Sequence, residues 1–170
     1  MDLKPSPEYI EFRKEVKSFL KDNLNMTGKA RNPARPNKNE LEWQDKLIKN
    51  GYAARTIPKD YGGYGAEPDV LKSRIIAEEF TNAQIPLGMA NQGISMFVPT
   101  LLELGTEEQK KSWIEKTIKG EVIWCQGYSE PGSGSDLASL QTKAVDDGDD
   151  FIINGQKIWI SSAQFSDMMF

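Results

Sequence analysis

The sequence predicts an α+β protein, with an all-α helical bundle over residues 1–120 and the first strands of a β-domain over residues 121–170. Two observations lead to this prediction. Up to about Gly120, apolar residues recur at helical spacing between helix-capping signals. Beyond Gly120, apolar and polar residues alternate, and turn dipeptides separate the segments. A chain of 170 residues is long enough to bury an apolar core.

Two helices are predicted in the first third of the chain. Ser6 is a candidate N-cap with Pro7 at the first helical position, and this helix is expected to run to about Asn23. Its apolar positions are Ile10, Phe12, Val16, Phe19 and Leu20. Prolines and basic residues predict a loop over residues 25–39, and a second helix is expected to end at Gly51.

Three further helices are predicted before the β-segment. The third begins at about Asp69, and its apolar positions include Ile75 and Phe80. The fourth covers residues 92–104 and is apolar on all sides, which predicts burial inside a bundle. Thr106 and Gln109 form a capping box that opens the fifth helix, and Gly120 ends it.

Strands are predicted from the alternation that begins at Val122. They are expected over residues 122–127, 139–144, 151–153 and 157–161. Asp147-Gly148 and Asn154-Gly155 are turn dipeptides of the kind that separates such strands. Residues 166–170 are typical of the start of another apolar strand.

Composition excludes several classes of function. The formal net charge is −4 and the chain has no basic stripe, which argues against nucleic-acid binding. There is no histidine, and Cys125 is the single cysteine, so the chain has no Ser-His or Cys-His nucleophile, no internal disulfide and no expected metal site. With neither a membrane-spanning apolar run nor a signal-peptide core, we expect a cytoplasmic protein without membrane contact. Difficult chemistry would have to come from a cofactor or from carboxylates.

A glycine-serine turn over residues 132–135 is the segment that indicates a particular chemistry. Gly132, Ser133, Gly134 and Ser135 are expected to present backbone N–H groups and two hydroxyls to an anionic or amide-bearing ligand. Trp159 is expected on the far strand of a hairpin, close to Ser161. A flat indole beside a hydroxyl donor suits a planar heteroaromatic cofactor, although packing inside a core is the more common role of such a residue.

Three segments, in the same order and covering nearly the whole chain, resemble the acyl-CoA dehydrogenase family. They are IPKDYGG at residues 57–63, LGTEEQK at residues 104–110, and SEPGSGSD at residues 129–136 followed by GDDFIINGQKIWISS at residues 148–162. The resemblance implies a helical N-terminal domain (1–120) and part of a β-barrel-like middle domain (121–170). It also implies FAD as cofactor, α,β-dehydrogenation of acyl-CoA thioesters, and electron transfer to an electron-transfer flavoprotein.

Site residues follow from the same resemblance, position by position. The positions that match flavin contacts are Gln126, Tyr128, Ser129, Trp159, Ile160 and Ser161, and those that match CoA contacts are Gly134 and Ser135. Gln126 occupies a position at which several relatives have an aromatic residue, and Ser161 occupies a position at which the family has a threonine. The family's catalytic glutamate lies in a second helical bundle beyond Phe170, so no residue is predicted to be catalytic and we expect the chain alone to be inactive. Glu130 and Asp136 flank the turn and are expected to cap N–H groups.

Several alternatives remain open at this point. The chain resembles acyl-CoA oxidases and flavin monooxygenases of the same superfamily as well, because the segments that separate them lie elsewhere. A non-catalytic subunit or interaction module that completes its fold with a partner chain is the rival from another class. The helix over residues 92–104 can form either a wall of the acyl-chain cavity or plain core. Incomplete strand edges predict a homo-oligomer or a partner subunit.

Overall fold

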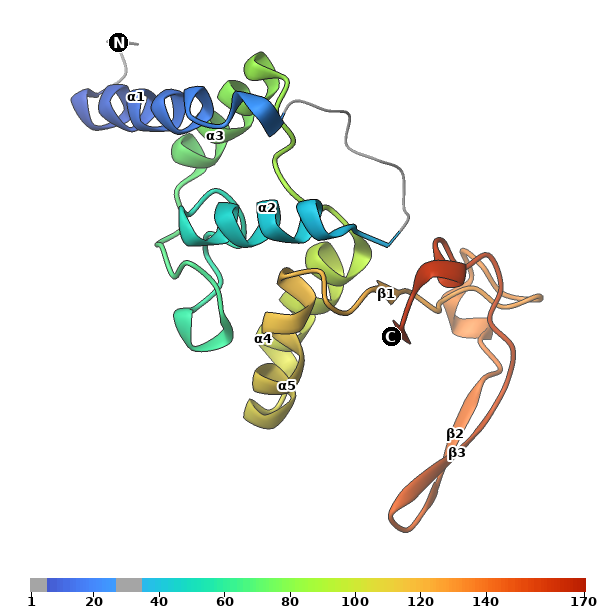
Figure 1. The fold of residues 1–170 in the computed structure, drawn as a ribbon. Coiled ribbons are helices and arrows are strands. Elements are labelled where there is room, and N and C mark those ends of the chain that lie inside the picture. Colours follow the sequence, from blue (N-terminus) through green and yellow to red (C-terminus); the bar gives the residue numbers. More distant parts are fainter. Residues whose placement is uncertain (1–5, 27–34) are drawn as a thin grey trace, which may run out of the picture.

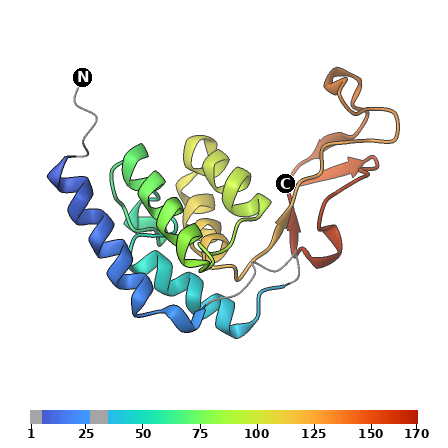
Figure 2. The ribbon, with the colours of Figure 1, turned by 90° about the horizontal axis from the view of Figure 1, so that it is seen from above.

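The computed structural model describes residues 6–26 and 35–170, with the helices gathered on one side and the strands on the other (Figures 1 and 2). The helices are α1 (Pro7–Lys21), α2 (Lys38–Lys49), α3 (Val70–Ala83), α4 (Val98–Leu104) and α5 (Glu107–Ile118), and a π-helix (Gly93–Phe97) leads into α4. The strands are β1 (Trp124–Cys125), β2 (Lys143–Asp147), β3 (Asp150–Asn154) and β4 (Met168–Met169). This order confirms the predicted α+β class. Residues 27–34 of the predicted loop lie outside the described residues.

The helix ends follow the capping signals in the sequence. The predicted capping box of α5 is confirmed: Gln109 N donates to Thr106 Oγ1 at 3.2 Å, and Thr106 N donates to Gln109 Oε1 at 2.9 Å. A second capping box, at Asn37, opens α2. Gly51 and Gly120 follow α2 and α5 with φ of 73° and 78°, a conformation that glycine adopts without strain.

The helices enclose two apolar clusters. The first lies where α1, α2 and α3 meet and contains Val16, Leu20, Trp43, Leu47, Ile75, Ile76, Phe80 and Ile85. The second joins the end of α2 to α4 and α5 and contains Ile48, Ile57, Val98, Leu101, Ile114 and Ile118. Arg13 of α1 pairs with Glu78 and with the buried Glu79 of α3, which fastens these two helices together.

The tyrosine-diglycine segment forms a tight connecting turn against α5. Gly63 N donates to Pro58 O at 3.1 Å, and Tyr61 Oη donates to Glu107 at 2.8 Å. A Cβ on Gly63 would lie 2.6 Å from the carbonyl carbon of Ile57, so only glycine fits there.

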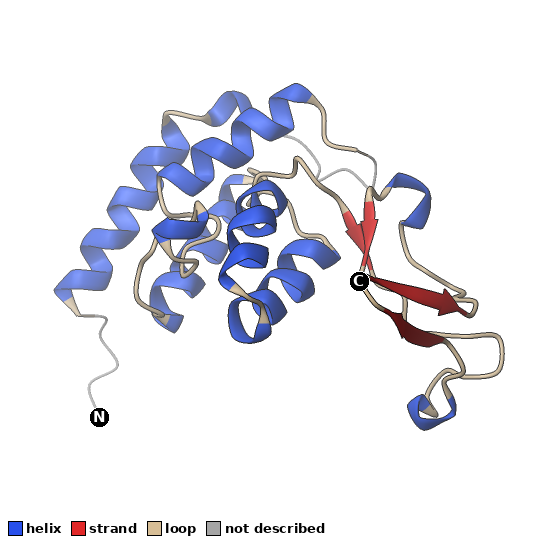
Figure 3. Cartoon of the chain, turned by 90° about the horizontal axis from the view of Figure 1, so that it is seen from below, coloured by secondary structure: helices blue, strands red, loops and turns tan. Residues whose placement is uncertain are grey.

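The strands form two small, separate sheets. β1 pairs in parallel with β4, and β2 pairs with β3 in an antiparallel hairpin that projects away from the helices (Figures 1 and 3). The predicted strand over residues 166–170 is present only over Met168–Met169, as β4. The turn between β2 and β3 is Gly148-Asp149, one residue later than the predicted dipeptide Asp147-Gly148, because Asp147 still pairs with Asp150. Among residues 6–26 and 35–170, none of the helices has the length and apolar character needed to cross a bilayer.

The predicted burial of the helix over residues 92–104 is wrong for half of its surface. Val98 and Leu101 are buried toward α5, but Leu104 is 78% exposed and Met96 is also exposed. The first five residues form a π-helix instead of an α-helix. Val98 and Leu101 share a cluster with Ile114 and Ile118 of α5, and Phe97 stacks on Trp124, so only part of the segment is covered.

Three strand predictions are also wrong in extent. Only Trp124–Cys125 of residues 122–127 pairs with another strand. Of residues 139–144, Ser139 is the last residue of a 3-10 turn (Leu137–Ser139). The backbone N–H groups of Gln141 and Thr142 donate to the side chain of Glu130 instead of a neighbouring strand, so β2 starts at Lys143. Residues 157–161 form no strand, because a φ of 53° at Trp159 interrupts the extended backbone.

Candidate functional site

The site begins at β1, which Trp124 anchors to the helices. Its indole is buried, lies 3.7 Å from the ring of Phe97 between centroids, and meets Trp113 edge-on at 5.4 Å. Its Nε1 donates to Thr117 Oγ1 of α5 at 2.9 Å. These contacts hold the start of the β-segment rigidly against the helical bundle.

The glycine-serine turn that follows has an inner and an outer half. Glu130 N donates to Ser133 O at 2.8 Å, and Ser133 N donates to Glu130 O at 3.0 Å, which closes the turn. Ser133 is buried, and its hydroxyl donates to Asp136 O at 2.6 Å. One of the two hydroxyls that the sequence offered to a ligand is therefore used inside the turn. Gly134 and Ser135 are exposed and form the outer half.

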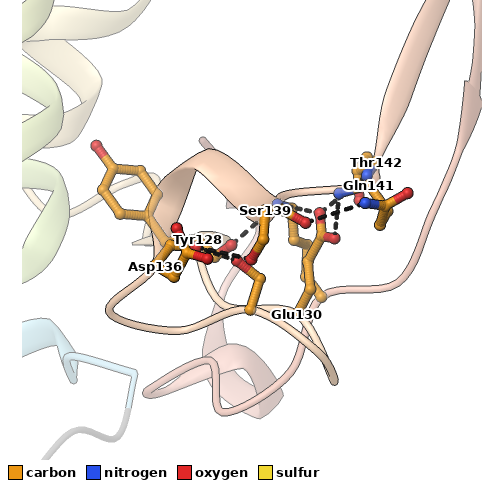
Figure 4. Close-up of polar contacts among 8 residues, drawn as sticks. Tyr128, Glu130, Asp136, Ser139, Gln141 and Thr142 are labelled. Carbon is orange, nitrogen blue, oxygen red and sulfur yellow. Dashed lines mark hydrogen bonds and ion pairs between the residues drawn. The ribbon is translucent and has the colours of Figure 1, made fainter.

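Glu130 is the buried carboxylate at the base of this turn. Its side chain accepts from Gln141 N at 2.6 Å, Thr142 N at 3.0 Å and Lys157 Nζ at 2.8 Å, and Figure 4 shows it facing the first two of these residues. The ammonium of Lys157 and the hydrogen bonds from Thr142 and Gln141 lower the pKa of Glu130 to about 2. The expectation that Glu130 caps N–H groups is confirmed. The other flanking carboxylate, Asp136, makes no side-chain cap, so the same expectation is wrong there.

The structure brings together the two segments that hold the predicted flavin contacts. Lys157 Nζ donates to Tyr128 O at 2.9 Å, and Ile158 N donates to Ser129 O at 2.9 Å. The segment that leads into Trp159 therefore lies alongside the segment that leads into the glycine-serine turn.

Trp159 presents an open aromatic surface. Its side chain is 84% exposed, and its φ of 53° is unusual for a bulky residue. Such a conformation costs about 1–3 kcal/mol and is concentrated at functional sites. Ile160 is half-buried and Ser161 is exposed beyond it.

The remaining predicted residue, Gln126, has an unsatisfied donor. Its Nε2 atom is buried and finds no hydrogen-bond partner within residues 6–26 and 35–170. A buried amide donor without a partner is costly unless a ligand or water completes it. The ring of Tyr128, two residues further on, is exposed.

A hollow of about 470 Å³ lies between the turn and the base of the hairpin. It is lined by Glu130, Pro131, Gly132, Ser139, Gln141, Gly155 and Gln156. None of the predicted flavin or CoA contacts lines it. The hollow and the predicted site are therefore different surfaces.

The sequence reasoning did not find the Glu130–Lys157 pair that organises the site. The two residues are 27 positions apart, and no motif spacing links them. The one available signal was a carboxylate directly before a Pro-Gly turn, which indicates a capping role and leaves the lysine unidentified.

Two family models match the chain in sequence. The model of the acyl-CoA dehydrogenase N-terminal domain matches residues 6–121, and that of the acyl-CoA dehydrogenase middle domain matches residues 125–170.

Individual relatives agree with these matches. The acyl-CoA dehydrogenase IpdE1 of Mycobacterium tuberculosis is 36% identical over 94% of this chain and 43% of its own length. FadE34 of the same organism, also an acyl-CoA dehydrogenase, is 54% identical over 73% of this chain and 17% of its own length. The crystal structure of the ChsE4-ChsE5 complex from Mycobacterium tuberculosis matches with a TM-score of 0.69 at 34% identity, over 100% of this chain and 42% of that chain. The chain thus spans less than half the length of these relatives.

Proposed function

The chain belongs to the acyl-CoA dehydrogenase family, and on this basis we propose that it forms the N-terminal domain and part of the middle domain of an FAD-dependent acyl-CoA dehydrogenase. The reaction would be α,β-dehydrogenation of an acyl-CoA thioester, and an electron-transfer flavoprotein would take the electrons. In this proposal the chain supplies one side of the flavin and CoA sites.

One observation carries the proposal: the exposed indole of Trp159 stands in a strained conformation beside the segment of Tyr128 and Ser129. An aromatic face left open to solvent suits a flat ring system. The Nε2 of Gln126, which has no partner among the residues that the structure describes, offers a donor to the polar edge of such a ring.

The residues present therefore fit a flavin. Those that would hold it are Gln126, Tyr128, Ser129, Trp159, Ile160 and Ser161. When bound, FAD supplies a hydride acceptor that no side chain can replace. The chain's own contribution is to bind the ring, orient it and cover part of it.

The outer half of the glycine-serine turn fits the tail of CoA. A Cβ built on Gly134 would meet no atom of residues 6–26 or 35–170 within 4 Å, so the backbone there is open to a ligand. Gly134 and Ser135 would offer N–H groups and a hydroxyl to the pantetheine and phosphate portions.

No residue of the chain is assigned as the base. The base must take up the α-proton, and Glu130, the buried carboxylate of the site, is a weak proton acceptor because Lys157 and its other hydrogen bonds lower its pKa to about 2. The proposal leaves this role to the glutamate that the family carries in its second helical bundle.

A second candidate is a subunit that completes the flavin site together with a partner chain. Two observations favour it: ChsE4-ChsE5, a similar structure, is a complex of two named proteins, and the β2–β3 hairpin exposes Val145, Phe151 and Ile153. Exposed apolar strands are typical of surfaces that another chain or domain covers.

Flavin binding tests both candidates. The visible absorption of the purified chain is recorded, and FAD is then titrated while its fluorescence is followed, for the wild type and for Trp159→Phe. Binding that Trp159→Phe weakens supports the flavin contact. Flavin retained only in the presence of a copurifying chain supports the subunit. Absence of flavin in both cases would contradict the proposed function.

A further inference from the structure

Glu130 is a buried charge whose role goes beyond closing a turn. Its side chain is 5% exposed, and burial of a carboxylate is unfavourable unless it is paired and hydrogen-bonded. Here the pairing comes from both sides of the β2–β3 hairpin. Gln141 and Thr142 donate from the residues before β2, and Lys157 donates from the residues after β3. The carboxylate therefore joins the turn to the two ends of the hairpin.

Lys157 carries this link to the proposed flavin contacts. Its ammonium is shared between Glu130 Oε1 at 2.8 Å and Tyr128 O at 2.9 Å. The next residue, Ile158, donates its N–H to Ser129 O at 2.9 Å, and Trp159 follows directly. Lys157, which the carboxylate of Glu130 holds, is only two residues before Trp159. The contacts of Lys157 and Ile158 therefore fix where the indole lies along the Tyr128 segment.

The same contacts exclude an acid-base role for Glu130. Three donors occupy its two oxygens, which leaves little room for a substrate proton. The ammonium of Lys157 and the other donors keep the pKa at about 2, so the group stays ionised near neutral pH.

From this geometry we infer that Glu130 is a positioning residue of the flavin site. Through Lys157, its carboxylate holds Trp159 at the place where the indole meets the flavin. The inference rests on the proposed function, because it concerns the same site.

Amide hydrogen exchange and flavin affinity together test this inference. In Glu130→Gln, exchange at Ile158 in the chain is expected to become about tenfold faster, since the clamp on this segment is lost. In the protein purified with any copurifying partner, FAD binding is expected to weaken about tenfold or more in the same variant. The visible bands of the remaining bound flavin are expected to shift.

Three further variants separate positioning from folding. Glu130→Asp keeps the charge and should restore part of the affinity. Lys157→Met removes the ammonium and should weaken FAD binding in the same direction as Glu130→Gln. Asp136→Asn is the matched control, because Asp136 flanks the other end of the same turn, is exposed and makes no side-chain cap. Its FAD affinity should equal that of the wild type.

The outcomes distinguish this inference from the proposed function. If Glu130→Gln lowers the thermal midpoint but, below that midpoint, has the FAD affinity and the flavin spectrum of the wild type, the positioning role is overturned. The proposed function stands in that case. A wild-type protein that binds no FAD would overturn the proposed function, and the positioning role with it.

Discussion

Trp124 and Trp159 carry the same side chain in the same segment but are expected to respond in opposite ways to the same substitution. Trp124 is buried between Phe97 and Trp113, whereas Trp159 is 84% exposed. We predict that Trp124→Phe lowers stability with little direct effect on flavin, and that Trp159→Phe weakens flavin binding with little effect on stability.

The magnitudes follow from the contacts that each indole makes. Trp124→Phe removes the donor to Thr117 Oγ1 and leaves a void beside Phe97, which together cost about 2 kcal/mol. With a urea dependence of about 2 kcal/mol per molar, the unfolding midpoint should fall by about 1 M. Trp159→Phe touches an exposed side chain and should change the free energy of unfolding by less than about 0.5 kcal/mol.

Urea unfolding followed by far-ultraviolet circular dichroism measures the first quantity, and FAD titration measures the second. Equal midpoints for wild type and Trp124→Phe would refute the anchoring role of Trp124. A midpoint that falls by about 1 M in Trp159→Phe would refute its exposure. Unchanged FAD affinity in Trp159→Phe would remove the main support for the flavin site.

Three other predictions follow from single positions. Gly134→Ala should leave the urea unfolding midpoint unchanged or slightly raised, because the new Cβ has no described atom within 4 Å. Calorimetry should show weaker CoA binding for this variant, and full CoA affinity would contradict the proposed contact. Gly63→Ala should lower the free energy of unfolding by about 2 kcal/mol or more, because the new Cβ would lie 2.6 Å from the carbonyl carbon of Ile57. Gly132→Ala is the neutral control in the same urea assay, because a Cβ there has no described atom within 4 Å. Lys157 and the other donors lower the pKa of Glu130 from 4.5 to about 2, so its carboxylate stabilises the fold above about pH 4.5 and loses this contribution as the pH falls toward 2. The thermal midpoints of wild type and Glu130→Gln should therefore converge in this acid range, and a constant difference would argue against the pairing.

The helical half of the fold could be predicted from local signals alone. Caps such as Thr106 with Gln109, and stops such as Gly51 and Gly120, act within one or two turns, so the sequence contains the whole interaction. The burial of residues 92–104 could not be predicted in the same way. It depends on which neighbours contact each face: Leu101 is buried in the cluster with α5, whereas Leu104, in the same helix, is 78% exposed.

The β-segment was harder to predict because its geometry depends on contacts between distant residues. Alternation suggested a strand over residues 157–161, yet the left-handed backbone of Trp159 ends any regular pairing. The start of β2 is set by Glu130, which takes the N–H groups of Gln141 and Thr142. Neither effect leaves a periodic pattern in the sequence.

The segment that most clearly indicates the family therefore combines two kinds of residue. Glu130 and Ser133 turn their polar groups inward and build the bend, whereas Gly134 and Ser135 remain open to solvent. A motif match alone gives every position in it equal weight. Burial and hydrogen bonding separate the residues that shape the turn from those that are free to meet a ligand. Substitutions in the first group should alter ligand binding indirectly, by displacing the residues that meet the ligand, and substitutions in the second group should alter binding directly while the turn keeps its shape.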